Sequence, residues 1–219
     1  MIALDKLEPT CKCPAIGCGF NADPTVRLCE EHHKYYRGDQ ELVSVTHVIK
    51  SVWPFESGFS LAAPSVLANA RRRGVQVDEL FSKYAVGDLR AIPIGTRTDS
   101  LRLFLRLKRW WSEHKHGEVR TQVLVADHSI AGTLDVCDDD TIYDLKTQYS
   151  IEPYSVLQIA GYADLFYQTF GRPIKKLGII HLTQRFPAPV LMSFDPAEVI
   201  QDWMLIRDTY LMAQRRTKK

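Results

Sequence analysis

The sequence lacks several features that would assign it to a special class of protein. No run of about 18 or more apolar residues occurs, which excludes a membrane-spanning helix. Residues 1–9 contain acidic side chains and no apolar stretch, so we expect no secretory signal. Internal repeats and low-complexity segments are also absent, and 45% of the 219 residues are hydrophobic, which is enough for one core. We therefore expect a globular, cytoplasmic protein.

An excess of charge of one sign is missing as well. The formal net charge is only +2, so the total does not indicate a nucleic-acid binder. The basic residues are nevertheless clustered, at Arg71–Arg73, within 97–120 and at 215–219. A chain of nearly balanced charge can still present one basic face to a phosphate polymer, although any single cluster could equally be a solvated helix surface.

The succession of hydrophobic patterns predicts an α/β fold. We expect a short helix capped by Thr46, a helix opened by Pro64, helical spacing over 77–84, a helix capped by Asp99 or Ser100, and helices over 154–170 and 197–214. We expect strands over 119–125, 130–136, 141–146, 177–182 and 189–194. This order predicts one domain over 43–219, with a mixed central β-sheet flanked by helices in three layers.

The most informative segment lies within 131–147. Asp144 and Lys146 are two apart on a predicted strand, so their side chains leave the same face, and Asp135 on the preceding strand can be brought beside them. Two carboxylates that face one point repel each other, and a divalent cation relieves this repulsion. Oxygen ligands favour magnesium or manganese, and a nearby lysine can hold or deprotonate an attacking water. An Asp-x-Lys triplet alone, however, is more often a surface ion pair.

The surrounding residues make the pattern more specific. Gly132-Thr133-Leu134-Asp135 is followed by a short turn, an apolar approach and then Asp144-Leu145-Lys146-Thr147. Gln158 and Tyr162 come next, four apart on one face of a predicted helix. Together these motifs resemble the PD-(D/E)XK nucleases, and particularly the RecB-type branch that includes lambda exonuclease.

This resemblance covers about 43–194 and implies a restriction-endonuclease-like core that hydrolyses DNA with a metal-activated water, leaving 5′-phosphates. The catalytic residues that it implies are Asp135, Asp144, Lys146, Glu118, Gln158 and Tyr162. The residues implied for Mg²⁺, or Mn²⁺, are Asp135, Asp144, Leu145, Asp78 and Glu118.

Two positions fit this family pattern less well. The family often has a glutamate on the strand before the Gly-Thr-x-Asp segment; we favour Glu118 because it is charged, although Gln122 lies closer to the usual spacing. The family also commonly has Gly-x3-His on an earlier helix, where this sequence has Gly74 followed by Asp78. Asp78 can still ligate through oxygen, but the difference leaves open whether one or two metal ions bind.

A cysteine and histidine cluster lies near the start of the chain. Cys13, Cys18, Cys29 and His32 supply three thiolates and an imidazole, the set that tetrahedral zinc prefers. Cys11 and His33 are adjacent alternatives, and reduced, unliganded cysteines are the competing interpretation. Some RecB-type relatives carry an iron–sulfur cluster, whose cysteines typically flank the nuclease core on both sides. Such a cluster is less favoured here, because no cysteine follows Cys137. We therefore predict a small, loop-rich zinc knuckle over 10–37 with a structural Zn²⁺.

The expected partner is DNA. Arg71, Arg72 and Arg73 are placed to meet its backbone, and Trp110 or Trp111 could stack on bases, although core packing is the more usual fate of a tryptophan. The leading hypothesis is a bacterial or phage exonuclease of recombination, repair or replication, with a recombination or replication protein as a further partner. A structure-specific endonuclease on the same core is the alternative within enzymes, and a non-catalytic DNA- or protein-binding module is the alternative outside them.

Overall fold

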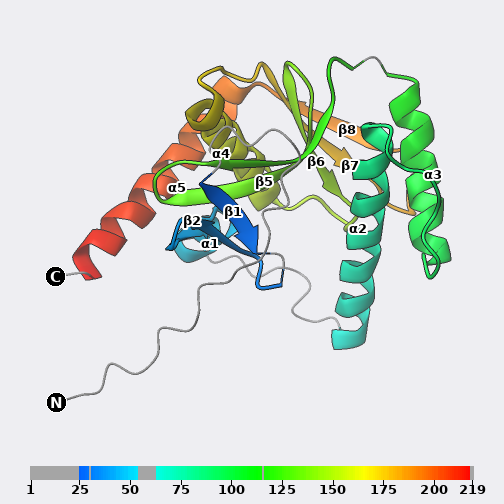
Figure 1. Ribbon diagram of the computed structural model, residues 1–219, viewed down its shortest axis with the longest axis horizontal. Helices are drawn as coiled ribbons and strands as arrows, with labels where there is room; N and C mark the ends of the chain where they lie inside the picture. Colours follow the sequence, from blue (N-terminus) through cyan, green and yellow to red (C-terminus); the bar gives the residue numbers. More distant parts are fainter. Residues whose placement is uncertain (1–24, 30, 54–62, 115, 218–219) are drawn as a thin grey trace.

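The computed structural model describes residues 25–29, 31–53, 63–114 and 116–217. Its strands are β1 (Val26–Cys29), β2 (Lys34–Arg37), β3 (Gln40–Ser44), β4 (Arg120–Ala126), β5 (Ile130–Cys137), β6 (Thr141–Lys146), β7 (Lys176–His181) and β8 (Val190–Phe194). Its helices are α1 (Val45–Val52), α2 (Pro64–Ala85), α3 (Thr98–Ser112), α4 (Pro153–Phe170) and α5 (Pro196–Thr217). Figure 1 shows how these elements are arranged.

The strands form one mixed sheet. Neighbouring strands follow the order β1-β2-β3-β5-β6-β7-β8, and β4 pairs with β5 in addition. The pairs β3–β5 and β6–β7 are parallel, whereas the remaining pairs are antiparallel. Aspartates shape both turns of the β4–β5–β6 meander: Asp127 Oδ1 accepts hydrogen bonds from the backbone N–H groups of Ser129 and Ile130, and Asp138 Oδ1 accepts from those of Asp140 and Thr141.

Strand β5 has a gap in its pairing that becomes important for the site. β3 pairs with its first residues, Ile130 and Ala131, and β6 pairs with its last residues, Val136 and Cys137. Residues 132–135 have no registered partner in either of these two strands, while β4 pairs with β5 along most of its length. The sheet therefore splays open beside the segment that ends in Asp135.

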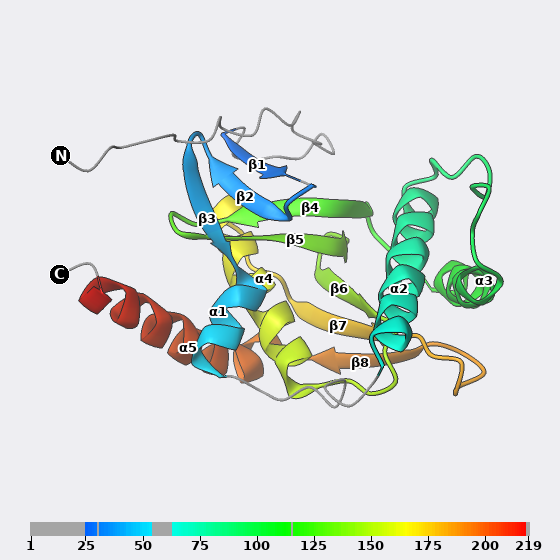
Figure 2. The same cartoon turned by 90° about the horizontal axis from the view of Figure 1, so that it is seen from below.

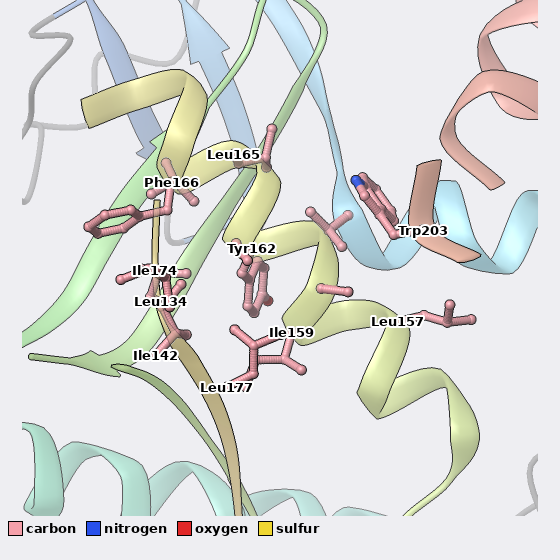
Figure 3. Close-up of a cluster of buried hydrophobic side chains, with 14 of the residues drawn as sticks. Leu134, Ile142, Leu157, Ile159, Tyr162, Leu165, Phe166, Ile174, Leu177 and Trp203 are labelled. Carbon is pink, nitrogen blue, oxygen red and sulfur yellow. The ribbon is translucent and has the colours of Figure 1, made fainter. Parts of the chain in front are cut away.

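Helices cover both faces of the sheet, so the fold has three layers, as Figure 2 shows. α1, α4 and α5 pack on one face around a large core that contains Leu134, Ile142 and Trp203. Figure 3 shows this core, with Tyr162 of α4 among its aliphatic side chains. α2 and α3 pack on the other face around Phe81, Phe104 and their neighbours. This arrangement confirms the predicted mixed sheet flanked by helices. No helix in the described part of the chain is both long and apolar enough to cross a bilayer.

The predicted strands and helices of the second half of the chain are confirmed to within a few residues. The end of α4 and the start of α5 can each be traced to one residue. Gly171 ends α4 with a left-handed backbone, at φ 68°, and its N–H donates to the oxygen of Tyr167. Asp195 caps α5, because its Oδ1 accepts from the Ala197 N–H at 2.8 Å.

The first half of the chain differs from the prediction in three ways. The predicted cap of α1 was wrong: Ser44 caps this helix, and its hydroxyl accepts from the His47 N–H at 3.1 Å. α3 begins two or three residues earlier than expected from a cap at Asp99 or Ser100, because Arg97 is its N-cap residue. The strands β1, β2 and β3 were not predicted, because their short polar segments carry little alternation of hydrophobic residues.

Candidate active site

The β5–β6 hairpin brings together three of the residues that the sequence singled out. Lys146 Nζ lies 2.7 Å from Asp144 Oδ2, and the Leu145 N–H donates to Asp135 Oδ2 at 2.8 Å. Asp144 is only 2% exposed. Because β6 pairs with β7 along its whole length, the backbone that carries these two charged side chains is held in place by β7. The carboxylate–lysine arrangement expected from the sequence is therefore present.

On the β4–β5 ribbon, the side chains that point to a given face of the sheet change at the position of Asp135. On β5, Leu134 packs into the core under α4, whereas Val136 packs into the core under α2 and α3. On β4, Val123 joins the first core, whereas the Thr121 hydroxyl bonds to the oxygen of Ser82 in α2. Residues two apart on a regular strand share a face, so the alternation is broken on both strands at once.

The backbone of Gln122 is the local cause of this reversal. Its φ is +52°, in the left-handed region that non-glycine residues rarely occupy, and it lies between the paired residues Thr121 and Val123. The side chain is thereby directed toward α2, where its amide donates to Asp78 Oδ2 at 3.0 Å and to Ser82 Oγ at 3.1 Å. Strained backbone of this kind is concentrated at functional sites.

Asp78 comes from α2 and joins the two aspartates of the hairpin. Its Oδ1 is buried and has no hydrogen-bond partner among the described residues. Gly74, one turn earlier, lets the helix approach the end of β6, because a Cβ there would lie 3.1 Å from Thr147 Oγ1. The Gly-x3-Asp spacing noted in the sequence thus places a carboxylate at the site.

The electrostatics show how closely these groups interact. Burial, together with the charges of Asp144 and Glu79, raises the pKa of Asp78 to about 6 despite the hydrogen bond from Gln122. Burial and the charges of Asp78 and Asp144 likewise raise the pKa of Asp135 well above its ordinary value. Burial alone would lower the pKa of Lys146, but the charges of Asp144 and Asp135 outweigh it and raise that pKa. Lys146 is therefore a cation, and the carboxylates favour the arrival of positive charge.

The donor set suits a hard divalent cation. Asp78, Asp135 and Asp144 offer carboxylate oxygens, Leu145 offers only its main-chain oxygen, and the buried, unpartnered Oδ1 of Asp78 points to a missing partner. No group of three or more Asp, Glu, His or Cys side chains in the described residues is already arranged to hold a metal ion. Binding would therefore require these side chains to move toward the ion, whose charge relieves their mutual repulsion.

Gln158 and Tyr162 of α4 support this cluster. Gln158 Oε1 accepts from Lys146 Nζ at 2.9 Å, and its amide donates to the Tyr162 hydroxyl at 2.9 Å and to Thr46 Oγ1 at 3.3 Å. The ring of Tyr162 lies against Gly132, where a Cβ would lie 2.6 Å from Cε1. These contacts explain the glycine of the Gly-Thr-x-Asp segment, and they show Gln158 holding the lysine in place.

Glu118 does not join the cluster. It precedes β4, its carboxylate pairs with Arg120 at 3.1 Å, and its side chain is 67% exposed. Gln122, the alternative to Glu118, is the residue that donates a hydrogen bond to Asp78. The geometry therefore does not support our preference for Glu118. The preference was based on charge alone, whereas the placement depends on the backbone conformation of β4.

Tyr35 is a residue of this site that the sequence did not indicate. It belongs to β2, and its hydroxyl lies 3.2 Å from Thr133 Oγ1, in the gap where β5 is unpaired. Burial and the nearby charge of Asp135 both raise its pKa. No local signal could have revealed this contact, since 98 residues separate Tyr35 from Thr133.

The remaining predicted residues divide between the surface, the core and the part of the chain that is not described. Arg71 and Arg72 are exposed on α2, Arg73 is half-buried, and Trp111 is a core residue stacked on His116. Cys13 and Cys18 lie outside the described residues, whereas Cys29 Sγ lies 3.2 Å from His32 Nδ1. The described part of the predicted zinc knuckle forms β1 and β2 rather than loops, and it pairs with β3.

Comparisons with known proteins agree with this fold. No family model and no curated protein matches the chain. Among solved structures, a candidate exonuclease from Eubacterium rectale matches with a TM-score of 0.54 at 13% identity, covering 80% of each chain. An alkaline exonuclease from Laribacter hongkongensis matches in complex with dAMP at a TM-score of 0.42, with 13% identity over 80% of this chain and 89% of that one. The chain therefore shares its fold with the Eubacterium rectale structure.

Proposed function

We propose that the protein is a metal-dependent deoxyribonuclease, and most specifically an exonuclease that leaves 5′-phosphates. The observation that carries the proposal is the convergence of Asp78, Asp135, Asp144 and Lys146 from α2, β5 and β6. The likeness to exonuclease structures at low identity concerns the fold, and the site supplies the chemical argument.

In this proposal the three aspartates and the main-chain oxygen of Leu145 hold Mg²⁺ or Mn²⁺, which activates the attacking water when bound. Lys146, kept protonated by Asp144 and Asp135, stabilises the negative charge that develops on the phosphate. Gln158 keeps the ammonium group oriented through its 2.9 Å hydrogen bond. Gln122 orients Asp78 through its hydrogen bond to Oδ2.

The test is digestion of end-labelled linear DNA, single- and double-stranded, with closed circular DNA beside it. We expect the wild type to degrade linear DNA in Mg²⁺ or Mn²⁺, and Asp144→Asn or Lys146→Met to lower the rate by about 1000-fold. Asp140→Asn is the matched control, because Asp140 is an exposed residue in the turn of the same hairpin and pairs with Lys175, which precedes β7. Cutting of circular DNA would favour the endonuclease alternative, and DNA binding without any cleavage would favour the non-catalytic module.

A structural zinc ion in the N-terminal segment is a separate proposal. Cys13, Cys18, Cys29 and His32 are its ligands, and the 3.2 Å contact between Cys29 and His32 supports the second half of this set. Elemental analysis of the purified protein should find one zinc per chain, lost in Cys18→Ser. Iron in its place, or no metal, would contradict the proposal.

A further inference from the structure

Helix α5 carries a stripe of exposed residues along its outer face. Its members alternate in steps of four and three residues along the chain, and they are Glu198, Asp202, Leu205, Thr209, Met212 and Arg216. At about 100° of rotation per residue, this spacing keeps all of them on one side of the helix. The buried residues of α5 lie on the opposite side, where Trp203, Ile206 and Tyr210 join the core under α4.

Two large apolar side chains of this stripe are uncovered. Leu205 is 69% exposed and Met212 is 56% exposed. Beyond Tyr210 the described part of α5 has no buried residue, and Figure 1 shows this end of the helix extending away from the sheet. Helices in proteins are stabilised mainly by packing of an apolar face. A partner that covers the stripe therefore supplies contacts that the chain itself does not.

The charges of α5 are divided between the two ends of the stripe. Glu198 and Asp202 lie one turn apart near the start, whereas Arg215 and Arg216 lie together near the end. None of these four side chains forms an ion pair within the part of the chain that the structure describes. Like charges four residues apart on a helix repel each other, so the acidic end favours a cation from outside.

We propose that α5 binds α5 of a second copy of this chain, in an antiparallel pair along the exposed stripe. The steps of four and three residues are the same read from either end, so a two-fold axis at the level of residue 207 brings the two stripes into register. Glu198 then lies opposite Arg216 of the second copy. The acidic end of each helix meets the basic end of the other, and Leu205 and Met212 are covered between them.

The helix dipole also favours acids at the start of a helix and bases at its end, but it does so equally in a monomer. The uncovered Leu205 and Met212 between the charges are what distinguish a binding face from a solvated helix. α5 packs on one face of the sheet and α2 and α3 on the other, as Figure 2 shows, so the pair leaves the α2 side open. The inference does not depend on the proposed nuclease function.

Sedimentation velocity of the full chain over a range of concentrations measures the Kd of the dimer. We expect a Kd on the order of 10 µM at about 0.1 M salt, and a larger Kd at about 1 M salt because the ionic contacts are screened. Leu205→Ala should raise the Kd by about tenfold, since the leucine lies at the centre of the pair. Leu105→Ala is the matched control, because Leu105 is 51% exposed on α3, and it should change the Kd by less than about twofold.

Reversal of charge tests the register. Glu198→Lys and Arg216→Glu should each raise the Kd by about tenfold, because each places like charges opposite one another at both ends of the pair. The double variant should return to within about threefold of the wild type. Within one helix these two residues are about 27 Å apart, so this rescue reports a contact between two chains. Both positions are exposed, so neither substitution removes a buried contact.

Three results would overturn the proposal. The first is a wild type that stays monomeric at about 200 µM. The second is a dimer whose Kd is unchanged in every α5 variant, which would locate the interface on another surface. The third is a double variant as weak as the two single variants combined, which would show that Glu198 and Arg216 do not meet. Circular dichroism of each variant checks that α5 remains helical.

Discussion

The two helices that flank the candidate site differ in how they are built. α4 buries ten of its 18 residues, and its contacts with the site pass through Gln158 and Tyr162. α2 buries four of its 22 residues, all from Val77 onward, so its arginine-rich first half is free to face a ligand. The comparison indicates that α4 is a well-packed support of the candidate site, whereas α2 contributes Asp78 and a less buried, arginine-rich first half.

Two aspartates provide the largest test of this difference. Asp78 of α2 has an oxygen with no partner in the described part of the chain, whereas Asp164 of α4 accepts from Trp203 Nε1 at 2.9 Å and from Arg207 at 2.7 Å. We expect Asp78→Asn to lower the cleavage rate by about 100-fold or more without loss of thermal stability. Asp164→Asn should leave the rate at 25 °C nearly unchanged but lower the free energy of unfolding by about 2 kcal/mol. Single-turnover cleavage and thermal unfolding distinguish the two, and a loss of stability in both variants would contradict the comparison.

Two glycines provide a second test. At Gly161 of α4, a Cβ would lie 2.8 Å from Val45 Cγ1 and 3.1 Å from the Trp203 ring. Gly161→Ala should therefore lower the free energy of unfolding by about 1–2 kcal/mol, since overpacking outweighs the gain in helix propensity. Gly74→Ala on α2 should change stability by less than about 1 kcal/mol, because only the Thr147 hydroxyl must move. Its cleavage rate should nevertheless fall by up to about tenfold, because Thr147 follows Lys146. Chemical denaturation and initial rates measure these effects.

The acidic cluster predicts a pH dependence of stability in the metal-free protein. The pKa of Asp78 rises from its ordinary value of 3.8 to about 6 on folding. Over this interval the folded state binds more protons than the unfolded state, so the free energy of unfolding falls as the pH rises. Asp135 shifts in the same direction. Thermal unfolding in EDTA should show a falling Tm between about pH 4 and 6, with a smaller slope in Asp78→Asn. Mg²⁺ at neutral pH should raise the Tm again, and a Tm indifferent to Mg²⁺ would count against a metal at this cluster.

Tyr35 gives the smallest expected effect, because it acts on the site only through Thr133. Tyr35→Phe removes the hydroxyl that lies 3.2 Å from Thr133 Oγ1 and keeps the ring in its place against Leu42 and Ala131. We expect the cleavage rate to fall by about threefold to tenfold, together with a weaker dependence on Mg²⁺ concentration. Tyr36→Phe on the same strand is the control. Equal rates for the two variants would show that β2 only completes the sheet.

Much of the site was predictable because its parts are close in sequence. Asp135 and Asp144 lie on consecutive strands joined by a turn that Asp138 closes, and the two-residue period of a strand places Lys146 on the same face as Asp144. Gln158 and Tyr162 share a helical face for the same kind of reason. By contrast, we favoured Glu118 over Gln122 on charge alone, and charge does not reveal the left-handed backbone that directs Gln122 toward Asp78.

The sequence by itself determined the carboxylate–lysine hairpin, its supporting helix and the α/β class, because local periodicity and turn chemistry dictate them. Only the tertiary structure decided that Tyr35 reaches β5 in the gap between β3 and β6, and that Arg73 rather than Arg72 lines a cavity beside Lys146. These placements depend on contacts between segments tens of residues apart. Such contacts form through packing of the whole sheet and its helices, and no short pattern in the chain records them.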